Sequence, residues 1–120
     1  MQRSIISTAL CSAFSAALLL CSLSAFAAES HQYIIERTIP GAQKLTAKEL
    51  KAISQKSRAV LESLGPEIQW QQSYVAEDKF YCVYQAPNKE IIAKHAKLGG
   101  FPADKIVEVS GIIGPQTAAD

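Results

Sequence analysis

Glu36, Cys82 and His95 carry the side chains of this chain that are best suited to chemistry. A carboxylate, a thiolate and an imidazole together suit a borderline transition metal such as nickel, zinc or copper. Each residue also has an ordinary structural role: His95 as a buried histidine with a hydrogen-bond partner, Cys82 as a small apolar side chain, and Glu36 as a solvated carboxylate. We predict a metal site formed by His95, Cys82 and Glu36, and we predict no catalytic residue.

No local motif specifies a ligand or a reaction. The sequence has no GxGxxG or P-loop pattern for phosphates, and no CxxC, HExxH or EF-hand spacing for a metal. The 12 basic and 11 acidic residues nearly balance, which leaves a net charge of +1. Because there is no basic excess to displace counterions from phosphates, we do not expect nucleic acid as a partner. Any site must therefore be assembled by the fold.

Residues 1–27 have the pattern of a secretory signal peptide. Arg3 supplies the positive start, an apolar centre covers residues 16–21, and Ala25-Phe26-Ala27 has the small-x-small pattern of a cleavage site. A retained membrane anchor is the competing interpretation, but serines keep the apolar run short. We expect cleavage, a periplasmic or secreted mature chain that begins near Ala28, and no membrane contact afterwards. Cys82 is then the single cysteine, so it cannot form a disulfide within the chain.

Residues 28–120 are predicted to form one domain. Four segments are rich in β-branched and aromatic residues and predict strands: 33–39, 68–75, 80–85 and 106–109. A helix is predicted after Thr46, because Thr46 and Glu49 have the spacing of a capping box, and Gly65 ends it. A second helix is predicted after Asn88, a favoured N-cap residue. The order of elements is therefore βαββαβ.

This order is that of the ferredoxin-like α+β fold. We predict a four-stranded antiparallel sheet with both helices on one face and with the first and third strands as central neighbours. Glu36 and Cys82 then lie on adjacent strands. Because side chains alternate between the faces of a sheet, the sequence leaves open whether Glu36 and Cys82 share the face of His95. The face without helices is where we predict a homodimer to form.

Several stretches of this chain resemble a family of small bacterial ferredoxin-like nickel-binding proteins that was formerly a domain of unknown function. The stretches are residues 35–41, 65–70, 73–75, 79–87 and 95–102, and the resemblance extends over roughly residues 33–110. It implies a ferredoxin-like fold, dimerisation and a nickel site. Glu36, Cys82 and His95 are candidate ligands by their place in the matching stretches. The predicted export signal sets this chain apart, because we do not expect every member of the family to have one.

Our leading hypothesis is an exported small metal-binding protein, with nickel as the first candidate and with zinc and copper as open alternatives. We expect His95 to matter more for the metal than His31, because His95 lies on a defined helix and His31 lies near the expected new N-terminus. The rival is a cleavage one residue later, which leaves Glu29-Ser30-His31 as a terminus able to wrap Ni²⁺ or Cu²⁺ through backbone nitrogens.

The alternative hypothesis is an enzyme of the dimeric α+β-barrel type that acts on a small molecule. In that case His95 is the general acid/base, and Trp70, Tyr81 and Tyr84 line the pocket. A third hypothesis is an interaction protein whose exposed sheet face binds another chain. The sequence offers no motif that identifies such a chain.

Overall fold

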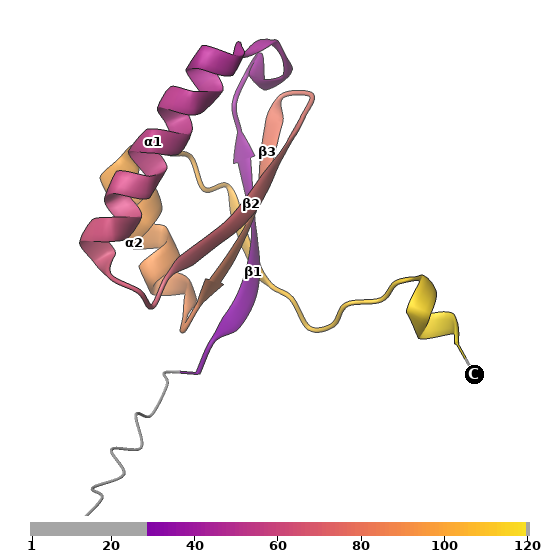
Figure 1. Ribbon diagram of the computed structural model, residues 1–120. Helices are drawn as coiled ribbons and strands as arrows, with labels where there is room; N and C mark the ends of the chain where they lie inside the picture. The colour runs from indigo at the N-terminus through magenta and orange to yellow at the C-terminus, as the bar shows by residue number, and fades with distance from the viewer. Residues whose placement is uncertain (1–28, 120) are drawn as a thin grey trace, which may run out of the picture.

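The computed structural model describes residues 29–119, and in this range it confirms the ferredoxin-like α+β arrangement (Figure 1). The elements in chain order are β1 (His31–Thr38), the short 3-10 helix η1 (Ala42–Lys44), α1 (Ala47–Leu64), β2 (Gln69–Ala76), β3 (Lys79–Ala86), α2 (Lys89–Gly99), β4 (Lys105–Glu108) and the 3-10 helix η2 (Pro115–Ala118). The predicted signal peptide, residues 1–27, lies outside the described residues. Within residues 29–119, no helix has both the length and the apolar character that crossing a membrane requires.

Both long helices begin where the cap residues predict. The Thr46 side chain accepts a hydrogen bond from the backbone N–H of Glu49, and the Glu49 carboxylate accepts one in return from the Thr46 N–H at 2.7 Å. Asn88 caps α2 through its Oδ1, which accepts the N–H of Ile91 at 3.0 Å. These bonds satisfy donors that a helix start otherwise leaves unpaired. Gly100 ends α2 in the left-handed conformation, with φ of 66°.

The register of the sheet decides which side chains share a face. Its order is β2-β3-β1-β4, with every neighbouring pair antiparallel. Ile35 is paired with Cys82, and Glu36 with Tyr81. Ile35 and Cys82 are buried on the face that α1 and α2 cover in Figure 1, which we call the covered face. Because side chains alternate, Glu36 and Tyr81 point to the opposite, uncovered face.

A β-bulge interrupts β2 and changes the alternation that the sequence shows there. Trp70 is paired with Tyr84, but Gln72 is paired with Val83, so Gln71 is the extra residue. The bulge lets Trp70 and Ser73, three positions apart, both reach the covered face. The Trp70 indole N–H donates to the Ser73 hydroxyl at 2.9 Å.

Candidate functional site

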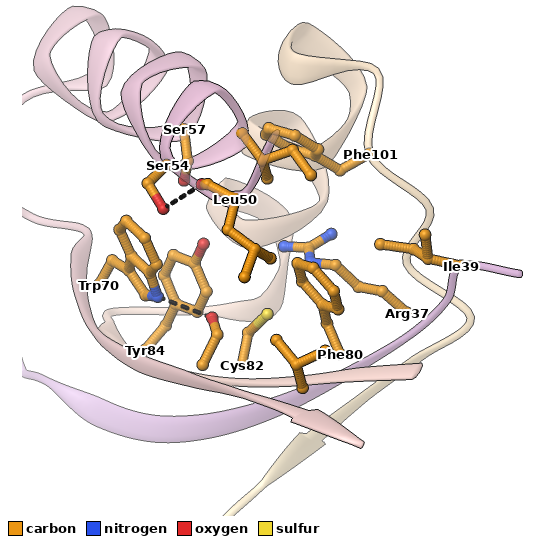
Figure 2. Close-up of a pocket in the computed structure, with 13 residues that line it drawn as sticks. Arg37, Ile39, Leu50, Ser54, Ser57, Trp70, Phe80, Cys82, Tyr84 and Phe101 are labelled. Atoms are coloured by element: carbon orange, nitrogen blue, oxygen red, sulfur yellow. Dashed lines mark hydrogen bonds between the residues drawn. The ribbon is translucent and has the colours of Figure 1, made fainter. Parts of the chain in front are cut away.

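A cavity of about 220 Å³ lies between α1 and the covered face of the sheet (Figure 2). Its lining comes from α1, the sheet and the loops that follow β1 and α2: Arg37, Ile39, Leu50, Ile53, Ser54, Ser57, Trp70, Ser73, Val75, Phe80, Cys82, Tyr84 and Phe101. Trp70 is partly exposed and Val75 is 40% exposed, so the cavity reaches the surface along the edge strand β2. Most of the lining is apolar, with the few polar groups that a small-molecule site typically has.

Of the described residues that line this cavity, Arg37 is the only one with a charged side chain, and it is 3% exposed. Its Nη1 donates to the carbonyl oxygen of Pro102 at 2.6 Å, and its guanidinium carbon lies 5.5 Å from the centre of the Phe101 ring. Its Nη2 is buried without a hydrogen-bond partner. Within residues 29–119 no carboxylate forms a salt bridge with it. Burying a cation without a counter-charge costs free energy. Within the described residues, the Arg37 guanidinium therefore lacks both a counter-charge and an acceptor for Nη2.

His95 is fully buried behind the cavity wall. Its Nε2 lies 3.2 Å from the Ser57 hydroxyl and 3.4 Å from the Ser57 carbonyl oxygen, while its Nδ1 has no partner. Burial lowers the pKa of His95, and the nearby Arg37 charge adds to this, although the Ser57 carbonyl opposes it. The imidazole is therefore neutral at neutral pH, and Ser57 rather than His95 meets the cavity.

Two further polar groups, Cys82 and Tyr84, line the cavity from β3. Burial raises the pKa of the Tyr84 phenol, while the Ser57 and Arg37 side chains act in the opposite direction. Cys82 is a free cysteine and is 3% exposed. Of the aromatic residues predicted to line a pocket, Trp70 and Tyr84 do so, whereas Tyr81 lies on the uncovered face.

The predicted metal ligands do not all lie together. Cys82 and His95 belong to the helix side of the sheet, but Glu36 lies on the uncovered face, where the Lys79 ammonium is 3.8 Å from its carboxylate. Across residues 29–119, no group of three or more His, Cys, Asp or Glu side chains is placed to hold one ion. The reason is the register: Ile35, not Glu36, is paired with Cys82. Within one chain, Glu36 therefore cannot complete a ligand shell with Cys82 and His95.

A different histidine has carboxylates beside it. His31, at the start of β1, contacts the Glu108 carboxylate through Nδ1 at 2.8 Å, and its Nε2 lies 3.9 Å from the Glu29 carboxylate. The His31 side chain is 34% exposed, in contrast to the buried His95. A carboxylate that accepts the Nδ1 proton of a histidine fixes its tautomer and leaves Nε2 free to bind a metal.

The chain matches a known protein family. The family described as nickel responsive protein SCO4226-like matches residues 33–109. The chain belongs to this family. The resemblance predicted from the sequence, to a family of small bacterial proteins of this kind, is confirmed.

A solved member of similar fold supports the architecture. The crystal structure of SCO4226 from Streptomyces coelicolor A3(2) superimposes with a TM-score of 0.58 at 21% identity, covering 68% of this chain and 99% of that one. Identity at this level supports the fold and not the site. No curated protein matches the chain.

Sequence reasoning missed Arg37 and Ser57 as site residues of this SCO4226-like protein. A signal for Arg37 was available, since Tyr33, Ile35 and Arg37 alternate along β1, and all three are buried on the covered face. Ser57 gave no comparable signal, because a serine inside a helix looks like any other polar helix residue. Its importance follows from its contact with His95, which only the packing of α1 against α2 produces.

Proposed function

We propose that this protein is an exported nickel-binding protein. The family description supports nickel, and the pattern of residues 1–27 supports export. The observation that carries the proposal in this chain is His31, whose Nδ1 is held by Glu108 and whose exposed Nε2 lies near the Glu29 carboxylate. Imidazole and carboxylate are suitable ligands for Ni²⁺, and they suit Zn²⁺ and Cu²⁺ as well.

The buried pair Cys82 and His95 is the other location for the metal. Both residues lie inside the segment that matches the family, whereas His31 precedes it by two positions. A neutral imidazole with an unpartnered Nδ1 is a competent ligand. The Arg37 cation weighs against this location, because it lies on the same side of the sheet and repels a divalent ion in a region of low dielectric. We therefore assign the metal to His31, although the sequence favours His95.

Calorimetric titration with Ni²⁺ tests the assignment, with Zn²⁺ and Cu²⁺ in parallel. We expect His31→Ala to weaken Ni²⁺ binding at least tenfold, as losses of ligands and their supporting residues do. His95→Gln, Cys82→Ser and Glu36→Gln should bind as the parent does. Loss of binding in His95→Gln or Cys82→Ser, with His31→Ala unaffected, would move the metal to the buried pair. A parent protein that binds no tighter than about millimolar contradicts the proposed function altogether.

The proposed export has its own measurement. The intact mass of the protein isolated from the periplasm or medium should lack residues 1–27, so that it begins near Ala28. A start at Glu29 would add the terminal nitrogen and backbone nitrogens of Glu29-Ser30-His31 to the metal site. A full-length species held in the membrane contradicts export of a mature chain.

We also propose that two copies associate through the uncovered face. Ile34 and Val107 on this face are 39% and 43% exposed, and the tail residues Ile112 and Ile113 are 76% and 86% exposed. Ile34, Ile112 and Ile113 border one hollow on this side of the sheet. Contiguous exposed apolar surface is typical of a protein–protein contact.

Light scattering tests the association. The parent should have about twice the monomer mass, and Ile112→Ser combined with Ile113→Ser should shift the protein toward monomer. Leu98→Ser is the matched control, because Leu98 is 56% exposed but lies on α2. A parent that remains monomeric at high micromolar concentration contradicts the dimer.

An enzyme is the second candidate, and the contact between Ser57 and His95 favours it. A hydroxyl within 3.2 Å of a neutral imidazole, at the wall of a cavity, is the arrangement in which a base activates a nucleophile. Incubation with a small activated ester should then leave an acyl group on Ser57, detected by peptide mass, and His95→Gln should abolish it. An unmodified Ser57 in the parent removes this candidate.

A further inference from the structure

We infer that the cavity beneath α1 binds a small monocarboxylic acid with an apolar body, and that Arg37 pairs with its carboxylate. This inference is independent of the proposed metal site, which lies at the other end of β1. It rests on a buried guanidinium that lacks a counter-charge, on the apolar walls around it and on the size of the cavity.

The guanidinium that lacks a counter-charge is that of Arg37. A guanidinium has five N–H donors in a planar fork that matches a carboxylate, and it stays charged at every physiological pH. Within the described residues, Nη1 of Arg37 donates to the Pro102 carbonyl oxygen and Nη2 has no partner. Figure 2 shows the guanidinium group among the apolar side chains of the cavity, below Phe101. An anion that enters the cavity supplies both the missing charge and the missing acceptor.

The walls select for an apolar body. Leu50 and Ile53 of α1 face the cavity from one side, and Trp70 and Phe80 of the sheet face it from the other. The Trp70 indole N–H already donates to Ser73, so this ring offers the cavity mainly its apolar surface. The volume of about 220 Å³ exceeds the roughly 150 Å³ of an apolar cavity that takes up benzene. A single aromatic ring with one short acidic group therefore fits.

The number of charged donors argues for a carboxylate and against a phosphate ester. Among residues 29–119, Arg37 is the only cationic side chain that lines the cavity, and no acidic side chain lines it. A dianionic phosphate buried here would keep an uncompensated charge, whereas one carboxylate and one guanidinium neutralise each other. The hydroxyls of Ser57 and Tyr84 in the same lining are suitable donors for the second carboxylate oxygen.

The binding test uses benzoate as the probe and benzyl alcohol as its neutral counterpart of similar size, each added to the purified protein with metal chelated. Two-dimensional NMR of the backbone amides and the Trp70 indole N–H follows binding. We expect benzoate to bind at least tenfold more tightly than benzyl alcohol, with shifts centred on Trp70, Ser57 and Phe101. Equal affinities, shifts centred elsewhere, or no binding of benzoate at 10 mM would overturn the inference.

Substitution of Arg37 separates its charge from its packing. Arg37→Met, which keeps an unbranched apolar stem but removes the charge, should abolish the preference for benzoate, and Arg37→Lys should keep part of it. If Arg37→Met does not fold, the affinities of the parent protein for benzoate and benzyl alcohol still test the inference. A crystal soaked with 4-bromobenzoate gives an independent result through the bromine signal: density beneath α1 supports the inference, and its absence there contradicts it.

Discussion

The two faces of the sheet leave opposite kinds of group without a partner. On the covered side, one buried nitrogen of Arg37 in β1 and one of His95 in α2 have no hydrogen-bond partner among the described residues. On the uncovered face, the charge of Glu36 lies near that of Lys79, while Ile34 is 39% exposed. Among the described residues, the covered side therefore has buried polar atoms that lack a partner, and the uncovered face has apolar side chains that lack cover. These unmet needs are why we propose a small ligand on the covered side and a second chain on the uncovered face.

The largest expected difference is between two neighbouring isoleucines on β1. Ile35 is fully buried on the covered face, so Ile35→Ala should lower the free energy of unfolding by about 2–5 kcal/mol. Ile34→Ala, on the uncovered face, should lower it by less than about 1 kcal/mol in dilute protein. Urea unfolding monitored by Trp70 fluorescence measures both values. Similar losses for the two variants would contradict the assignment of the faces.

The second comparison concerns two glycines. A Cβ at Gly99 would lie 2.3 Å from the Phe101 ring, which stacks on His95 with ring centres 5.7 Å apart. Gly99→Ala should therefore displace Phe101 and destabilise the protein by about 1–3 kcal/mol. Gly111→Ala is the control, because, apart from its chain neighbours, no atom of the described residues lies within 4 Å of its added Cβ. Its unfolding curve should overlay that of the parent, and an equal loss in the control would refute the argument from packing.

The third prediction is a loss of stability in acid that originates on the covered face. Because burial lowers the pKa of His95 below 6.5, the unfolded chain takes up a proton in mild acid while folded His95 stays neutral. The free energy of unfolding should therefore fall as the pH drops below about 6.5, by at most about 1.4 kcal/mol per pH unit for this group. His95→Gln should flatten the profile between pH 7.5 and 5.5. A steep profile that survives in His95→Gln would assign the loss to other groups.

The smallest expected effect is that of the ion pair on the uncovered face. The Lys79 and Glu36 side chains are 41% and 30% exposed and lie 3.8 Å apart, so water and salt screen their attraction. Glu36→Gln should change the free energy of unfolding by less than about 1 kcal/mol, and added salt should reduce the difference further. A double-mutant cycle with Lys79→Met measures the pair directly. A coupling of several kcal/mol would contradict the screening of this ion pair by water and salt.

Much of the fold was predictable because it depends on local signals. Thr46 and Asn88 cap the helices as their residue types predict, and the runs of β-branched and aromatic residues form the strands. The bulge at Gln71 was visible only as imperfect alternation in β2. The antiparallel order of the sheet followed from the βαββαβ pattern.

The site was less predictable because it depends on register and packing. A shift of one residue in the pairing of β1 and β3 would have placed Glu36 rather than Arg37 on the covered face. The contact between Ser57 and His95 joins residues on two helices, and no local pattern encodes it. Residue types alone identified His95 and Cys82, but not the cation beside them.

The proposed metal site lies at the exposed start of β1 and not on the covered face beside Arg37. Two-dimensional NMR during addition of Ni²⁺ tests it most directly, because signals near the bound ion shift or broaden. We expect the affected amides to centre on His31 and Glu108, while those of Cys82 and His95 stay unchanged at one equivalent of Ni²⁺. Signal changes centred on Cys82 and His95 would contradict it.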